Sequence, residues 1–147
     1  MQRAIKWMPK PEIDAPCADI SFSWASEKGA RLAVMMHFSR IVGGFSKDLE
    51  LVFGRPLAVA WEEESFGLIE SPEILPKCSG ADFRQYSHPT LIVEHSNWAE
   101  KYAAHKFAEG APEAENVKHY FLVSLNDLVH VLAESTPEAA WVASAGA

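Results

Sequence analysis

Hydrophobic and polar residues alternate with a period of two along much of the first half of the chain. The first alternating stretch holds Ile20, Phe22 and Trp24, and after a polar turn at 26–29 the pattern resumes between Leu32 and Phe38. Such alternation is typical of strands that bury one face. We therefore predict an antiparallel hairpin with Trp24 on its buried face.

A second pair of alternating segments follows. Apolar residues recur from Leu49 to Phe53 and again from Leu57 to Trp61, with Gly54-Arg55-Pro56 between them. A link this short favours an antiparallel hairpin. The alternation places Trp61 on the buried face, whereas the outward positions and the end of the strand are acidic: Glu50, Glu62, Glu63 and Glu64.

The last third of the chain has a mixed pattern. Residues 90–95 have the composition of a buried strand, and residues 117–124 form a near-continuous apolar run. Between them, residues 97–109 indicate a helix with Ser96 or Asn97 as its N-cap. A strand, a helix and a strand within about thirty residues have the spacing of a parallel βαβ unit, and an antiparallel arrangement of the two strands stays open.

Three further segments complete the predicted fold. A short helix is expected at about 126–134, because one helical face would collect Leu125, Leu128, Val129 and Leu132. Residues 1–16 hold three prolines and are expected to be irregular. Residues 137–147 are Ala-rich and form a weak tail that carries Trp141.

Length and composition suit one globular domain. The chain has 147 residues, of which 48% are hydrophobic. We predict a single α+β domain over residues 1–147, in which antiparallel hairpins feed a mixed sheet. The main helix, through Trp98 and Tyr102, and the short C-terminal helix pack on that sheet.

The net charge limits the classes of partner that the protein is expected to bind. Thirteen Lys and Arg residues stand against twenty Asp and Glu residues, which gives a formal charge of −7. That acidity argues against nucleic acid and anionic membrane surfaces as partners. The sequence has no apolar run of the ~20 residues that a spanning helix needs, and its N-terminus lacks the apolar core of a secretory signal. We expect a cytoplasmic protein.

The acidity is concentrated in one region. Between Lys47 and Glu73, seven acidic and two basic residues give a local charge of −5, whereas the first eleven residues carry +3. A concentrated patch of one sign steers partners of the opposite sign. We therefore expect a small interaction protein, of an immunity or inhibitor type, that binds a basic protein and self-associates through an apolar edge. The expected contact residues are Glu50, Glu62, Glu63, Glu64 and Trp7.

Catalytic and metal-binding motifs are absent from the sequence. It has no Gly-rich phosphate loop and no nucleophile elbow, its two cysteines lie far apart, and no two of its six histidines are three or four residues apart. No metal or cofactor is predicted. The alternative function is a small-ligand site or an enzyme with a pocket near residues 71–89 and the strand end at 95. Its candidate residues are His95, Glu94, Cys78, His88 and Asp82.

Overall fold

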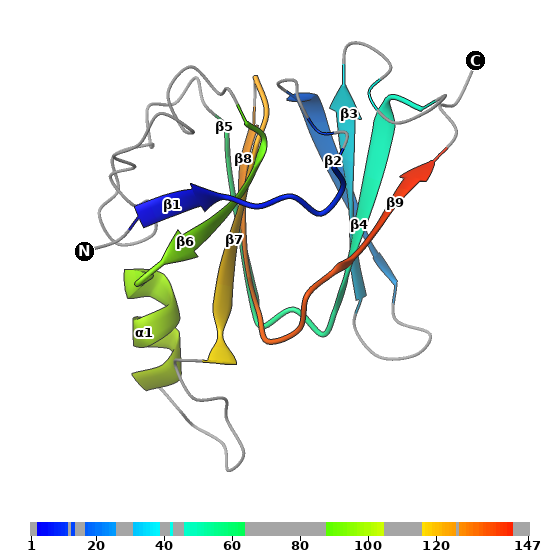
Figure 1. The fold of residues 1–147 in the computed structure, drawn as a ribbon. Helices are drawn as coiled ribbons and strands as arrows, with labels where there is room; N and C mark the ends of the chain where they lie inside the picture. The colour runs from blue at the N-terminus through cyan, green and yellow to red at the C-terminus, as the bar shows by residue number, and fades with distance from the viewer. Residues whose placement is uncertain are drawn as a thin grey trace.

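Antiparallel strands make up most of the structure, which is a computed structural model (Figure 1). It describes residues 3–11, 13, 17–25, 31–38, 42, 46–63, 88–104, 116–125 and 127–142. Within these ranges there is one helix, α1 (Asn97–Ala104), and there are nine strands: β1 (Arg3–Lys6), β2 (Cys17–Ala25), β3 (Arg31–Phe38), β4 (Asp48–Gly54), β5 (Ala58–Glu63), β6 (Thr90–Glu94), β7 (Lys118–Val123), β8 (Asp127–Ala133) and β9 (Glu138–Val142).

The strands form two sheets that face each other. The five-stranded sheet has the order β1-β6-β7-β8-β5, and the four-stranded sheet has the order β2-β3-β4-β9. Every ladder between neighbouring strands is antiparallel. The chain passes from one sheet to the other between β1 and β2, between β4 and β5 and between β8 and β9 (Figure 1). Strands β2 and β5 are each an outer strand of their sheet.

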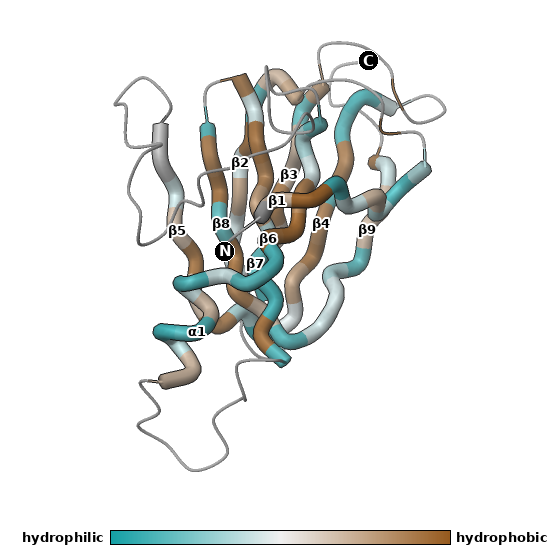
Figure 2. Tube along the Cα trace, turned by 60° about the vertical axis from the view of Figure 1, so that its left-hand side comes forward, coloured by the Kyte–Doolittle hydropathy of each residue, from teal (hydrophilic) through white to brown (hydrophobic). Residues whose placement is uncertain are grey.

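The main hydrophobic core lies between the sheets. Its members with no exposed surface from the four-stranded sheet are Leu32, Val34, Met36, Leu49, Leu51 and Phe53, and those from the five-stranded sheet are Tyr120, Leu122, Val129, Val131 and Ala133. Figure 2 shows the same hydrophobic stretches along the facing strands. The other face of the five-stranded sheet is also buried, and α1 covers part of it through Ala99 and Ala103. Burial on both faces makes this sheet the centre of the molecule.

Predictions that depend on local signals are confirmed. Strands β2 and β3 form the first hairpin, and β6 and β7 lie where strands were expected. Helix α1 begins at Asn97, and Ser96 is its cap, because the Ser96 hydroxyl accepts the Ala99 N–H at 3.1 Å. Trp98 and Tyr102 pack against the cluster beneath the helix. The predicted helical residues beyond Ala104 lie outside the described residues.

The second predicted hairpin is wrong. Strand β4 pairs with β3 and β9, whereas β5 pairs with β8 in the other sheet. The link holds Arg55 with a positive φ of 54°, and it carries the chain across the core instead of back along β4. The register of β8 explains the choice: Val59 lies opposite Val131, and both side chains pack on the main core from the five-stranded side.

The predicted C-terminal helix is also wrong. Residues 127–133 form β8, in which every residue is buried. Leu128 and Leu132 pack on one face and Val129 and Val131 on the other. A strand buried on both faces needs apolar residues at consecutive positions, and such a run also contains the spacing of a helical face.

The two ends of the chain are more ordered than predicted. In the segment expected to be irregular, β1 pairs with β6, and in the expected tail, β9 pairs with β4. Trp141 of β9 lies 5.8 Å from the ring of Phe38. Strands β6 and β7 are antiparallel neighbours, so the βαβ unit is wrong and the antiparallel alternative is confirmed. No helix among the described residues is long and apolar enough to cross a membrane.

Candidate functional site

The structure places the acidic contact residues of the sequence on two different sheets. Glu50 lies on β4, on the outer face of the four-stranded sheet. Glu62 and Glu63 are the last positions of β5, where the register sets them opposite Leu128 and Asp127. Glu64 lies outside the described residues. Glu50 is therefore separated from the rest of the acidic run.

Trp7, a predicted contact residue, is half-buried and packs against the main core. Its ring lies 4.9 Å from that of Tyr120 and packs against the main core. Its backbone N–H donates to the Thr90 carbonyl at 3.0 Å, which extends the pairing of β1 with β6. This Trp fastens the N-terminal strand to the sheet.

The described members of the alternative catalytic set, His88, Glu94 and His95, do not come together in one site. His88 is buried before β6 and hydrogen-bonds the Trp7 carbonyl, whereas Glu94 and His95 are exposed at the other end of that strand. Seven residues of extended chain separate the two histidines by roughly 20 Å. Cys78 and Asp82 lie outside the described residues.

Three large aromatic side chains are exposed on the outer strands β2 and β5. Phe22 is 41% exposed, Trp24 58% and Trp61 51%. The register sets Phe22 opposite Val34, Trp24 opposite Leu32 and Trp61 opposite Val129, and these three partners are all core residues. The aromatic side chains thus face inward, as their alternation predicted, but they lie at the margin, where the facing sheet does not cover them. We call Phe22, Trp24 and Trp61 the aromatic edge.

A pair of carboxyl groups adjoins the aromatic edge. The Trp61 Nε1–H donates to Asp127 Oδ1 at 3.0 Å, and Asp19 on β2 is close enough to raise the pKa of the Asp127 carboxyl. Burial raises the pKa of Asp127, and the Asp19 charge raises it further. Glu63, which belongs to the acidic run of Glu62, Glu63 and Glu64, is opposite Asp127 in the ladder. The acidic run therefore begins beside this pair of carboxyl groups. The edge combines exposed aromatic rings with negative charge.

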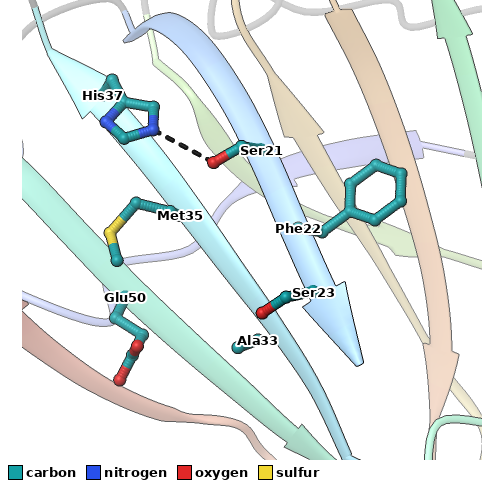
Figure 3. Close-up of a pocket in the computed structure, with 7 residues that line it drawn as sticks. All are labelled: Ser21, Phe22, Ser23, Ala33, Met35, His37 and Glu50. Atoms are coloured by element: carbon teal, nitrogen blue, oxygen red, sulfur yellow. Dashed lines mark hydrogen bonds between the residues drawn. The ribbon is translucent and has the colours of Figure 1, made fainter. Parts of the chain in front are cut away.

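Three polar residues form a row on the outer face of the four-stranded sheet. Ser21 Oγ lies 3.1 Å from His37 Nε2, and His37 Nδ1 lies 2.9 Å from Asp48 Oδ1. They line or adjoin a shallow depression of about 290 Å³ that also contains Met35 and Glu50 (Figure 3). Sequence motifs missed this row because its members come from three strands, and only the register brings them together.

A second histidine cluster is buried on the helix side of the five-stranded sheet. Ser96 Oγ lies 2.7 Å from His119 Nδ1, and His119 Nε2 lies 2.7 Å from His130 Nδ1. Both histidines have no exposed surface. Burial lowers the pKa of His119 to about 4, and burial together with the His119 charge lowers that of His130 well below its usual value. The cluster has no opening for a ligand.

Neither histidine group amounts to a metal centre. In the described ranges no three His, Cys, Asp or Glu side chains come together as ligands for a metal ion. Comparison with protein-family models, with curated proteins and with solved structures finds no match.

Proposed function

We propose that this protein binds a basic protein partner at the aromatic edge, along the free side of β2. The observation that carries the proposal is the exposure of Phe22 and Trp24 on β2 and of Trp61 on β5, where Trp61 is hydrogen-bonded to Asp127. Exposed aromatic clusters are enriched at protein interfaces. The immunity- or inhibitor-type role is the form of this proposal in which the partner is a basic effector.

The backbone of β2 offers hydrogen bonds to an extended partner segment. The Phe38 N–H donates to the Lys47 carbonyl, so Phe38 faces β4 and the adjacent His37 faces β2. Groups alternate along an antiparallel ladder. Applied to the β2–β3 register, this alternation directs the N–H and C=O of Phe22 and Trp24 away from β3. An added strand would pair with these groups.

Charge selects the partner. Burial raises the pKa of Asp127, and the nearby Asp19 raises it further, so a negative charge on Asp127 is costly without a cation beside it. An arginine or lysine of the partner removes that cost and stacks on the exposed ring of Trp61. A basic segment is therefore favoured over a neutral or acidic one.

Binding of synthetic strand-forming peptides tests this proposal. Calorimetric titration should show binding of a peptide of alternating arginine and valine, and no binding of its glutamate counterpart. Trp61→Ala and the double variant Asp19→Asn/Asp127→Asn should each weaken the arginine peptide about tenfold, the factor expected for loss of roughly 1.4 kcal/mol.

Glu138→Gln supplies the matched control, because Glu138 is an exposed acidic residue on β9, the opposite edge of the same sheet. It should leave the affinity unchanged. Equal binding of both peptides, an equal effect of Glu138→Gln, or absence of binding would contradict the proposal. So would a dimer of the protein formed through β2 that the arginine peptide does not dissociate.

A further inference from the structure

The row of Ser21, His37 and Asp48 has the connectivity of an activated serine. His37 and Asp48 are directly opposite each other on β3 and β4, and Ser21 on β2 is diagonal to His37, since it pairs with Met35. Each ring nitrogen has one partner: Nδ1 contacts the carboxylate at 2.9 Å and Nε2 contacts the hydroxyl at 3.1 Å. This is the pattern in which a histidine base serves a serine nucleophile.

The carboxylate fixes the proton on the ring. An ionised Asp48 only accepts hydrogen bonds, so His37 donates from Nδ1, and the Nε2 lone pair accepts the Ser21 hydroxyl proton. Asp48 is itself held, because its backbone N–H donates to the Ser46 hydroxyl at 3.1 Å and only 14% of its side chain is exposed. The His37 side chain is 38% exposed, which leaves the pair open to a substrate.

The depression limits the size and the charge of a substrate. Its volume of about 290 Å³ is at the small end of ligand sites, and Ala33 and Met35 give it an apolar floor (Figure 3). Glu50 lines the same depression and disfavours anionic groups. Small neutral or cationic acyl groups suit this space.

The edge of β2 limits where the developing oxyanion can lie. The Phe22 N–H, one residue after Ser21, points to the free side of β2 and so away from the depression over β3. Figure 3 shows the Phe22 side chain also directed away from the other residues of the depression. An ester oxygen reaches this donor only where it extends past the edge of β2, and a partner strand paired with Phe22 would compete for the same N–H.

We propose that Ser21 is a nucleophile for acyl transfer from small neutral or cationic esters, with His37 as its general base and Asp48 as a positioning residue. As Ser21 Oγ bonds to the ester carbonyl carbon, its proton passes to His37 Nε2. The C–O bond of the ester then breaks, and the leaving alcohol takes that proton. Water next attacks the acyl-serine and gives a proton to His37, which returns it to Ser21 as the acid leaves. The balance is ester plus water to acid plus alcohol.

Acylation by p-nitrophenyl acetate tests this inference on the full chain. Intact-mass measurement should show one acetyl group, and peptide mapping should place it on Ser21. Ser21→Ala and His37→Asn should lower the rate of nitrophenol release by about a hundredfold or more, the range for loss of a nucleophile or general base. Ser135→Ala, an exposed serine after β8, should keep the wild-type rate.

Asp48→Asn separates positioning from folding. The rate should fall through kcat with KM unchanged, because His37 loses the carboxylate that orients its ring, while urea unfolding stays as in the wild type. Acetylation confined to lysines, or an undiminished rate in folded Ser21→Ala, would overturn the inference. Neither result depends on peptide binding.

Discussion

At the residue scale, the contact between His119 and His130 determines how the protein responds to acid. The two rings are 2.7 Å apart through His119 Nε2 and His130 Nδ1, so one proton lies between them. Phe121 stacks on His130 with ring centroids 4.3 Å apart, and Trp98 meets His119 edge-on. In the described structure His130 Nε2 is buried with no hydrogen-bond partner. A second charge in this surrounding is strongly disfavoured.

We predict that the protein loses stability between pH 7 and pH 5. His119 stays neutral in the folded protein because its pKa is about 4. In the unfolded chain a histidine takes up a proton near pH 6.5. Below that value the unfolded state binds more protons, so the free energy of unfolding falls with pH, by about 2 kcal/mol at pH 5 for His119 alone. Urea unfolding at pH 7, 6 and 5 measures this fall.

Two variants identify the group responsible. His95 is exposed, so His95→Asn should keep the wild-type fall, and Asn suits the positive φ of 54° at that position. His119→Gln should be less stable at pH 7 but should lose less between pH 7 and 5. An unchanged fall in His119→Gln would contradict the prediction. A His119 ring that titrates near pH 6.5 by NMR would contradict it as well.

At the element scale, the sequence predicts what is local and misses what depends on pairing. The alternation of β2 and β3 and the cap of α1 need only neighbouring residues, and both are confirmed. Whether Gly54-Arg55-Pro56 turns back or crosses to another sheet depends on β8, seventy residues later. Because β8 is buried on both faces, its sequence lacks the alternation of apolar and polar residues that would distinguish a strand from a helix.

In the candidate sites, too, local sequence patterns predict some features, whereas others depend on how the strands pair. The predicted burial of Trp24 and Trp61 is wrong, because alternation gives the phase of a strand but carries no information on how far the opposite sheet extends. Their exposure follows from their place on outer strands. The row formed by Ser21, His37 and Asp48 can be predicted only when the register of β2 with β3 and that of β3 with β4 are both known. The signal in the sequence was only that Ser21 and His37 occupy the polar phases of their strands.

We predict that truncating two aromatic residues on either side of Leu32 in the four-stranded sheet lowers the free energy of unfolding by very different amounts. Phe53 on β4 has no exposed surface and lies 5.3 Å from the ring of Tyr120, so Phe53→Ala should lower the free energy of unfolding by about 3–5 kcal/mol. Trp24→Ala removes a larger but mostly exposed side chain and should cost about 1 kcal/mol or less. Urea denaturation compares them, and equal losses would show that Trp24 is covered in solution.

At the scale of the whole molecule, charge is distributed along the five-stranded sheet. The basic positions Arg3 and Lys6 lie on β1, and the acidic positions Glu62 and Glu63 lie on β5, which are the opposite edges of that sheet (Figure 1). These strand positions therefore put basic residues at one edge of the sheet and acidic residues at the edge that carries Trp61. In the proposed interaction, a basic partner would approach from the β5 side.

This polarity predicts how salt acts on the proposed interaction. Raising NaCl from about 0.05 M to about 0.5 M shortens the screening length to a few ångströms, so binding of the arginine–valine peptide should weaken about tenfold, mainly through slower association. Lys6→Glu adds negative charge at the far edge and should change the affinity little. Asp19→Lys places a positive charge at the aromatic edge and should abolish binding of the peptide at both salt concentrations. Affinity that does not vary with salt would mean that the aromatic rings alone hold the peptide, and that the acidic run does not select the partner.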